Sequence, residues 1–246
     1  MYEDEYTNMY LLEDTYWYYK ALHELLEYYV KEFSNSRDKN LRILDAGCGT
    51  GKWLTVLENY GQAEGIDYSQ EAIKYCRQRG LQNIDVHDIR EYEYGENKYD
   101  LLTCIGVIYC FEHPHEIPIL QNFYRALKPG GILILDSPAF NILMRKHDIA
   151  VGGKRRYRRS ELIPALTDIG FKVEIQSYRL SFLFVPVLIK KYVEKLQKDS
   201  HIKSDLRPLP RLINGSLLLL HRIENDFIKK KWDFPFGTSF LVVAKK

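Results

Sequence analysis

The chain has 246 residues and a mass of 29.1 kDa, and its 46% hydrophobic and 28% charged residues are typical of a globular protein that buries its own core. This composition excludes a disordered or collagen-like chain. The formal net charge is only +2, but residues 1–32 carry −6, residues 33–150 carry −3 and residues 151–246 carry +11, so the last third is strongly basic.

Residues 1–38 are predicted to form a helical cap. Apolar residues recur there at roughly helical spacing, which is typical of one or two amphipathic helices; they are Leu11, Leu12, Tyr18, Leu22, Leu25, Leu26 and Tyr29. The acidic start does not fit a signal peptide, and no apolar run approaches the roughly 20 residues of a spanning helix. The four cysteines lack C-x-x-C spacing, so we expect reduced thiols, no metal site and a cytoplasmic protein.

Residues 39–179 alternate short apolar runs with helical stretches. The expected strands lie at 41–46, 63–67, 84–87, 99–105, 132–136 and 171–178, and the expected helices at 52–60, 70–79, 115–127 and 160–169, with a turn at 128–131. Alternation of this kind predicts an α/β fold with a parallel sheet.

The region that follows departs from this alternation. Two apolar helical stretches, at 181–197 and 210–230, are too long for a loop of a compact sheet. We therefore predict a helical insertion over residues 180–236, before a last strand within 237–246. The whole chain, 1–246, is predicted to be a single domain.

The most informative local pattern is a glycine-rich turn between the first strand and the helix after it. It reads Asp45-x-Gly47-x-Gly49-x-Gly51. Such glycines let a ligand approach the backbone, and the helix start offers free N–H groups. Asp67 ends the next strand, where a carboxylate would accept hydrogen bonds from both ribose hydroxyls. The two features together predict a nucleoside ligand.

The glycine spacing distinguishes two nucleoside cofactors. A dinucleotide fingerprint has G-x-G-x-x-G spacing, so the G-x-G-x-G spacing here disfavours NAD. With Ile66-Asp67, Asp88-Ile89, Tyr99-Asp100 and Leu-Lys-Pro-Gly-Gly at 127–131, the pattern resembles the motif series of the class I S-adenosylmethionine-dependent methyltransferases over residues 40–180. The resemblance implies a Rossmann-like, doubly wound sheet that is mostly parallel with an antiparallel last strand. It also implies S-adenosylmethionine as the cofactor.

The resemblance assigns roles to the glycine loop. It implies that Gly47, Gly49 and Gly51 face the methionine part of the cofactor and that Asp45 orders their loop. Methyl transfer from a sulfonium is an in-line displacement, and much of its rate can come from alignment of the acceptor. Such an enzyme needs no nucleophile of its own.

Residues after the other strands would complete the cofactor site. The resemblance implies that Asp67 holds the ribose, with Tyr68 beside it, and that Asp88 accepts from the adenine amino group. Ile89 would contact the adenine ring, and Ile105 would lie beneath the methionyl group.

A narrower resemblance links the chain to bacterial and archaeal methyltransferases of unassigned substrate. These share Glu-x-x-His-Trp-Trp near the N-terminus, His-Asp…Gly-His-x-Arg-Arg-Tyr after the fifth strand, and Pro-Phe-Gly before the last. The corresponding segments here are 13–18, 147–157 and 235–237, with Tyr16, Tyr18 and Gly153 replacing His, Trp and His. Any role of those two imidazoles therefore does not transfer.

Catalytic candidates follow the fourth and fifth strands. His147 is the first candidate for a general base toward an oxygen acceptor, because it lies at the ligand-binding edge and titrates near neutral pH; a surface loop histidine is the alternative. His113 is the rival candidate, although a helix-initiating turn is the favoured explanation of its place. Tyr157 and Arg156 would orient a polar or acidic acceptor, or else belong to a solvated basic loop.

A nucleic-acid substrate is less expected than a small-molecule or lipid-linked acceptor. Relatives that methylate an exocyclic base amine carry Asn/Asp-Pro-Pro-Tyr/Phe after the fourth strand, whereas residues 105–108 read Ile-Gly-Val-Ile. Cys104 falls within the fourth strand and is predicted to be a core residue rather than the nucleophile of a cytosine methyltransferase. The basic residues 154–159 keep RNA as an alternative acceptor.

Two further segments predict features of the acceptor. Tyr16, Trp17 and Tyr18 are expected to form a lid that walls the acceptor pocket, or else to pack the cap on the sheet. Residues 180–189 are nearly uncharged and lead into Lys190 and Lys191; this pattern favours two helices that pack on each other and on the sheet, and a membrane surface or a lipid-linked substrate is the alternative. We therefore predict O- or N-methylation of a small-molecule, lipid-linked or glycan-linked acceptor. A non-catalytic interaction protein that binds the cofactor is the alternative.

Overall fold

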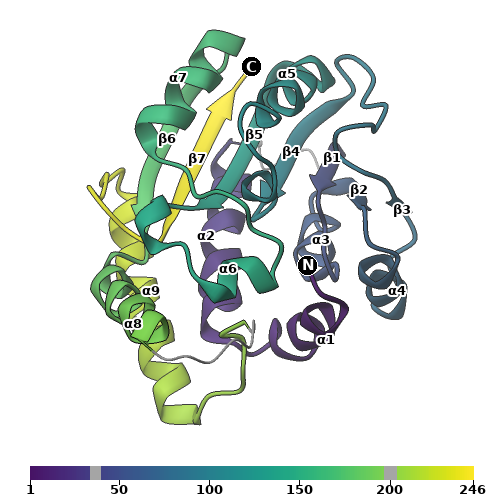
Figure 1. Ribbon diagram of the computed structural model, residues 1–246. Coiled ribbons are helices and arrows are strands. Elements are labelled where there is room, and N and C mark those ends of the chain that lie inside the picture. Colours follow the sequence, from purple (N-terminus) through teal and green to yellow (C-terminus); the bar gives the residue numbers. More distant parts are fainter. Residues whose placement is uncertain (34–39, 197–203) are drawn as a thin grey trace.

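The computed structural model of the protein describes residues 1–33, 40–196 and 204–246 (Figure 1). Within them, seven strands form one sheet in the order β3-β2-β1-β4-β5-β7-β6. The strands are β1 Leu41–Ala46, β2 Gly61–Asp67, β3 Ile84–Val86, β4 Tyr99–Ile105, β5 Leu127–Pro138, β6 Lys172–Arg179 and β7 Ser239–Lys245. Only β7 among them runs antiparallel to its neighbours. This architecture confirms the predicted Rossmann-like α/β fold.

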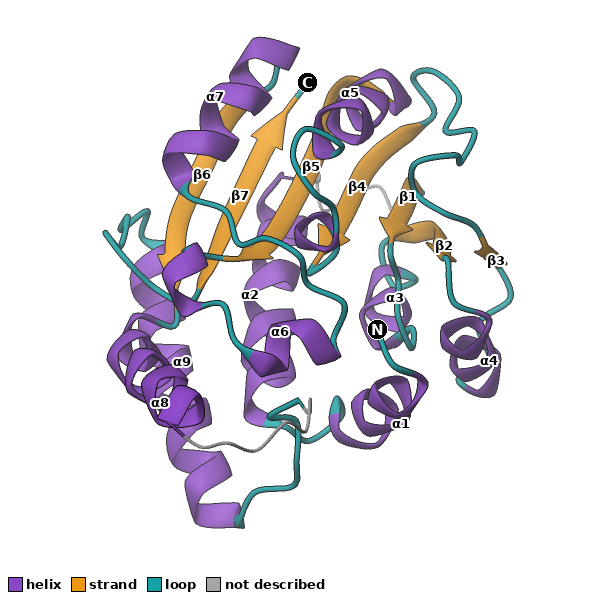
Figure 2. Ribbon diagram, in the orientation of Figure 1, coloured by secondary structure: helices purple, strands orange, loops and turns teal. Residues whose placement is uncertain are grey.

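Helices cover both faces of the sheet (Figure 2). They are α1 Glu3–Leu12, α2 Trp17–Phe33, α3 Lys52–Leu57, α4 Gln70–Gln78, α5 Glu116–Ala126, α6 Lys146–Ala150, α7 Arg159–Ile169, α8 Phe184–Leu196 and α9 Arg211–Lys229, with short 3₁₀ turns η1 Ile108–Cys110, η2 Asn141–Leu143 and η3 Ser181–Leu183. Helices α5 and α7 pack on one face of the sheet, and α2, α3, α4 and α9 pack on the other.

The strand sequences explain this two-sided burial. Successive side chains of a strand point to opposite faces, so a central parallel strand must be apolar at every position. In β1, Ile43 joins the core beneath α2 and Leu44 joins the core beneath α5, and both are fully buried. Helix α2 buries Leu22 and Leu26 on the side that faces the sheet, as its helical period predicts.

The structure corrects several element boundaries. The residues of the expected turn at 128–131 belong to β5, where the N–H of Gly130 donates to the Lys246 carbonyl at 2.9 Å; Gly130 keeps a turn-like φ of +81°, and the pairing with β4 shifts register here. Helix α6 and the 3₁₀ turns are not predicted by the sequence pattern, since they are too short to carry a period. The expected helix at 181–197 divides into η3 and α8; its last residue and the predicted cap boundary at 38 lie outside the described residues.

The carboxyl ends of β1, β2, β4 and β5 meet at one edge of the sheet. Figure 1 shows α1, α6 and α8 beyond that edge, and α8 and α9 both on the β6 side of the molecule. In doubly wound sheets this edge binds ligands, at the point where the strand order reverses. Here that point lies between β1 and β4.

Candidate functional site

The glycine loop lies at this switch point and turns through left-handed backbone, with φ of +86° at Gly47 and +55° at Gly49. The N–H groups of Gly47 and Cys48 both donate to the Ile66 carbonyl, at 2.8 and 2.9 Å, which ties the loop to the end of β2. A Cβ added at Gly47 would lie 2.2 Å from a Val107 methyl group. Only glycine therefore allows the loop to approach the segment after β4.

Asp45 anchors the loop from below. Its Oδ1 atom accepts a hydrogen bond of 2.6 Å from the Thr103 hydroxyl of the neighbouring strand β4. Burial raises the pKa of the Asp45 carboxyl to about 7, since no cation lies against it. Ile105, two residues beyond Thr103, ends β4 half-buried beside the same edge.

Asp67 is 6% exposed at the end of β2. One carboxylate oxygen accepts from the Ser69 N–H at 3.0 Å and from the Tyr6 hydroxyl at 3.3 Å, and the other accepts from the Gly49 N–H at 3.1 Å. Burial raises the pKa of this carboxyl. The structure thus joins two elements of the predicted cofactor site directly, and adds Tyr6, which the sequence analysis does not predict.

The residues predicted to surround the nucleoside follow β2 and β3. Asp88 pairs with the guanidinium of Arg90 at 2.5 Å, and this bond holds the pKa of its carboxyl below the usual value. Ile89 is buried. The exposed Tyr68 accepts a hydrogen bond of 2.7 Å from the amino terminus of Met1. Asp88 therefore presents a charged and partly solvated edge, unlike the enclosed Asp67.

Helix α1 lies over the glycine loop. The Met9 methyl group lies 2.6 Å from the position that a Cβ at Gly49 would take, so Met9 fills the space above that glycine. Glu13 is buried, accepts from the Thr50 hydroxyl and pairs with Arg79 at 2.7 Å, while Arg79 also donates to the Thr50 carbonyl at 3.0 Å. The sequence signal for this contact is Glu13, which begins segment 13–18.

The aromatic residues predicted as a lid lie beside the insertion. Trp17 begins α2, is 6% exposed, and its ring lies 5.6 Å from the ring of His221 in α9. Tyr18 stacks on the same imidazole at 6.3 Å, and the ring of the partly exposed Tyr16 lies 5.9 Å from Trp17. In this conformation these residues pack the cap against the insertion, and α1 covers the glycine loop.

His147 lies on α6, a helix rather than the expected loop. Its Nδ1 atom accepts a hydrogen bond of 3.1 Å from the Asp205 N–H. Burial lowers the pKa of the imidazole to about 4, so the ring is neutral at pH 7. A neutral imidazole whose Nδ1 accepts carries its proton on Nε2. In this geometry the free nitrogen of His147 is a hydrogen-bond donor.

The other catalytic candidates lie on different parts of the fold. His113 and Tyr157 line a depression of about 220 Å³ between α5 and α7. His113 is exposed and pairs with Glu116 at 2.8 Å, whereas the Tyr157 hydroxyl is buried and donates to the Ile108 carbonyl at 3.4 Å. Arg156 is buried against Asp148 at 2.8 Å. The structure thus brings Arg156 close to His147 through Asp148, and places His113 and Tyr157 at the depression between α5 and α7.

A buried polar cluster beyond β5 and β6 is absent from the sequence-predicted site. Arg179 and Asp136 form an ion pair in which both side chains are at most 2% exposed. Arg179 also donates to Nε2 of His221 at 3.0 Å, and burial lowers the pKa of that imidazole well below its usual value. Trp17 Nε1 and His221 Nδ1 are buried there without a hydrogen-bond partner among the described residues. The strand-ending position of Asp136 is the one available sequence signal.

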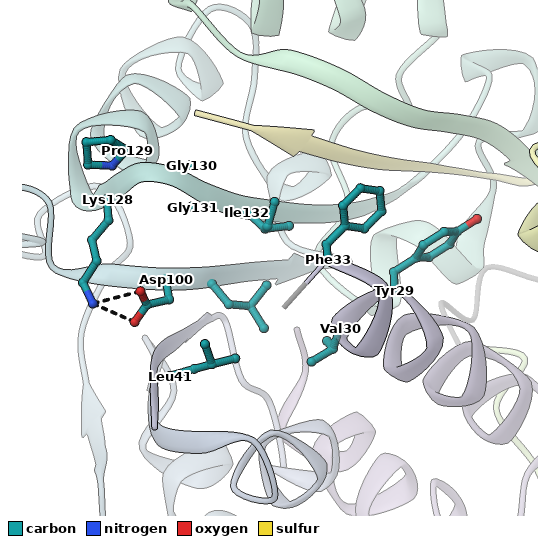
Figure 3. Close-up of a pocket in the computed structure, with 11 residues that line it drawn as sticks. Tyr29, Val30, Phe33, Leu41, Asp100, Lys128, Pro129, Gly130, Gly131 and Ile132 are labelled. Carbon is teal, nitrogen blue, oxygen red and sulfur yellow. Dashed lines mark hydrogen bonds and ion pairs between the residues drawn. The ribbon is translucent and has the colours of Figure 1, made fainter. Parts of the chain in front are cut away.

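Figure 3 shows a cavity of about 270 Å³ at the opposite edge of the sheet. Tyr29 and Phe33 of α2 and Leu41 at the start of β1 line it, and Lys128 pairs with Asp100 at 2.7 Å at its rim. This cavity lies at the amino ends of the strands, away from the glycine loop. It contains none of the residues predicted for the cofactor.

The sheet order and the glycine loop at the β1–β4 switch point give the chain the Rossmann-like fold of solved S-adenosylmethionine-dependent methyltransferases. A family model described as a methyltransferase domain matches residues 37–171, more than half of the chain, and the chain belongs to this family.

Known proteins resemble the chain over different lengths. The S-adenosylmethionine-dependent methyltransferase from Mesorhizobium loti superposes with a TM-score of 0.60 and 18% identity, covering 95% of this chain and 100% of that one. The probable tRNA methyltransferase 9B of Bos taurus is 31% identical over 43% of this chain and 23% of its own length. The demethylmenaquinone methyltransferase of Listeria monocytogenes is 29% identical over 39% of this chain and 44% of its own length. The chain spans less than half of these two curated relatives.

Proposed function

We propose that the protein transfers the methyl group of S-adenosylmethionine to oxygen or nitrogen of an apolar acceptor, either a small molecule or a lipid-linked one. The cofactor supplies an electrophilic methyl group. The acceptor atom attacks it with a lone pair, the carbon–sulfur bond breaks with its electron pair on sulfur, and the acceptor proton leaves to water or a base.

The residues at the switch point fit such a cofactor chemically. The left-handed Gly47 and Gly49 let the backbone come close to the methionyl part once Met9 of α1 moves away, and Asp67 and Asp88 offer carboxylates for the ribose and the adenine amino group. Asp67 already accepts the Tyr6 hydroxyl, which is the kind of donor that a ribose would provide. We infer that the cofactor replaces Tyr6 at Asp67 and that α1 shifts to admit it.

The observation that carries the apolar acceptor is a cluster of tyrosines beyond β4 and β5, in which Tyr109 is buried and Tyr18 and Tyr19 are partly exposed. Burial raises the pKa of Tyr18 to about 12 and the pKa values of Tyr19 and Tyr109 well above the usual range. Tyr18 lies near Asp136 at the end of β5, and Tyr109 belongs to η1 after β4. Aromatic, weakly hydrated walls suit apolar ligands whose few polar groups need orientation.

The basic residues that favour RNA are largely neutralised within the fold. Arg155 pairs with Glu161 at 2.5 Å, Arg156 is buried against Asp148, and Arg159 pairs with Asp233. Phosphate binding needs cations that exchange their counterions for the nucleic acid. The demethylmenaquinone methyltransferase relative, named for a quinone, supports the apolar alternative as directly as the tRNA methyltransferase relatives support RNA.

The chain also limits how the acceptor proton is removed. His147 offers a donor nitrogen, so we assign it to orienting an acceptor oxygen rather than to taking its proton. The same imidazole would become a base if binding of the acceptor released Asp205. An amine acceptor that enters uncharged needs no such base before methyl transfer.

Incubation of the purified protein with methyl-labelled S-adenosylmethionine and a cell extract tests the proposal. The extract is then separated into organic-soluble, aqueous small-molecule and RNA fractions, and each is analysed by mass spectrometry. We expect the label in the organic-soluble fraction or in an apolar small molecule.

The matched control is Asp67→Ala, which should weaken cofactor binding by about 1–3 kcal/mol, measured by calorimetry, because ribose hydroxyls lose their acceptor. Label confined to RNA would overturn the apolar acceptor. Unchanged cofactor affinity in the variant would remove Asp67 from the cofactor site.

A further inference from the structure

Helix α8 turns its apolar side toward solvent. Its exposed residues recur at the spacing of one helical face and are 44–83% exposed; they are Val185, Ile189, Tyr192, Val193 and Leu196. No residue of α8 is buried. A surface helix of a globular protein normally directs such a stripe at the core. In α8 the stripe has no partner among the described residues.

Polar contacts attach α8 to the rest of the molecule. Glu194 pairs with Arg145 at 2.9 Å, and the Lys191 ammonium group donates to the Ile142 carbonyl at 2.8 Å. Arg145 is itself almost buried. At the start of the helix, the Phe184 ring lies 5.4 Å from the rings of Phe140 and Phe236. Helix α8 is therefore held by this first residue and by its polar side, and the apolar stripe that follows Phe184 points outward.

Helix α9 likewise turns polar residues toward the protein and apolar residues toward solvent. Its buried residues include His221, Glu224 and Asn225. Glu224 accepts from the N–H groups of Leu180 and Ser181 at 2.6 and 2.7 Å, just before α8, so the two helices are joined there. The outward residues are 46–86% exposed; they are Leu212, Ile213, Leu219, Leu220, Ile223 and Phe227.

Cations surround these apolar faces. Residues 180–236 contain eleven lysines and arginines against six acidic residues. Lys230 and Lys231 follow α9, are exposed and form no ion pair with another described residue. Beside them Trp232 is 58% exposed, and its ring lies 6.0 Å from that of Phe227. Exposed tryptophan and lysine beside an apolar helix face are typical of helices that lie in a membrane interface.

We propose that α8 and α9 form a docking surface for an anionic lipid bilayer, with the apolar faces entering the headgroup region and the lysines contacting lipid phosphates. None of the helices in the described residues is long and apolar enough to cross a membrane, so the contact is peripheral. A second copy of the chain would oppose this positively charged face with its own like charge, which is unfavourable. The proposal of this docking surface does not depend on which acceptor the enzyme methylates.

Vesicle co-sedimentation tests the surface with the full chain. Vesicles of phosphatidylcholine alone are compared with vesicles that also contain phosphatidylserine, at low and high salt. We expect salt-sensitive binding to the anionic vesicles. Two variants should each reduce it by about tenfold or more: Lys230→Glu/Lys231→Glu, which removes cations, and Ile189→Ser/Leu219→Ser, which removes exposed apolar groups.

The control is Lys74→Glu/Arg77→Glu on α4, which makes the same charge change at exposed positions across the molecule (Figure 1). It should bind as the wild type does, and circular dichroism should show all variants folded. Failure of the wild type to bind anionic vesicles at low salt would overturn the proposal. So would light scattering that shows a wild-type dimer which Ile189→Ser/Leu219→Ser dissociates.

Discussion

Two helices that pack side by side on one face of the sheet, α2 and α9, have opposite polarity. Helix α2 buries leucine and valine and exposes charge. Helix α9 buries His221, Glu224 and Asn225 beside Ile228, and exposes leucine and phenylalanine. Both helices have a helical period of apolar residues. The contrast teaches that an amphipathic pattern identifies a helix but not which of its faces is buried.

The inversion has a physical origin at the end of β6. Arg179 ends that strand fully buried, and it needs Asp136 and a neutral His221 as partners. Glu224 caps the chain where β6 leads into η3. Once the polar face of α9 meets these requirements, its apolar face can only point outward.

We expect the largest effect when the buried cluster of Arg179, Asp136 and His221 is broken. Arg179→Met leaves Asp136 charged and buried, and we expect a loss of about 3–5 kcal/mol in the free energy of unfolding, measured with urea. The control lies on the same strand: Lys172 is 78% exposed and pairs with Glu174. Lys172→Met should cost less than about 1 kcal/mol. Equal losses in both variants would show that the insertion is not held by the Arg179 cluster.

The second prediction compares two buried aspartates. Asp136 has a guanidinium partner, whereas Asp45 accepts a hydrogen bond from the Thr103 hydroxyl, and burial raises the pKa of Asp45 to about 7. The folded protein therefore holds this proton more tightly than the unfolded chain, so stability from this group falls as pH rises from about 4 to about 7. The asparagine side chain of the Asp45→Asn variant does not titrate, so the stability of that variant lacks this pH dependence.

We therefore expect the unfolding free energy of Asp45→Asn, relative to the wild type, to increase over that pH range and then level off. Urea unfolding at a series of pH values measures it. A difference that does not vary with pH would mean that the Asp45 carboxyl is well hydrated and keeps its ordinary pKa.

The sequence predicts the sheet and the glycine loop well because both depend on local patterns. Short apolar runs that alternate with helical stretches, the Asp45-x-Gly47-x-Gly49-x-Gly51 turn and the strand-ending Asp67 are readable without knowledge of the fold. Contacts between distant segments are not. Nothing near Tyr6 in the sequence indicates that its hydroxyl meets Asp67, and nothing near Arg179 indicates that α9 supplies an imidazole.

The third prediction concerns helix α1 on the cofactor side. Tyr6→Phe keeps the buried ring and removes the hydroxyl that occupies Asp67. If the cofactor replaces that hydroxyl, calorimetry should show tighter binding of S-adenosylmethionine, by about 0.5–1.5 kcal/mol. Tyr2→Phe, at an exposed position before α1, is the matched control and should bind as the wild type does. Weaker binding by Tyr6→Phe would instead make the hydroxyl a ligand of the cofactor.

The smallest expected effect tests the inverted polarity itself. Leu219 is 60% exposed on α9, so Leu219→Ser should change the free energy of unfolding by less than about 0.5 kcal/mol in the absence of lipid. Leu26→Ala, on the buried face of α2, should cost about 2–5 kcal/mol in the same urea titration. A large loss for Leu219→Ser would place this leucine in a core and remove it from the docking surface. A small one means that folding does not require an apolar residue there, so any loss of vesicle binding in Ile189→Ser/Leu219→Ser reports the surface alone.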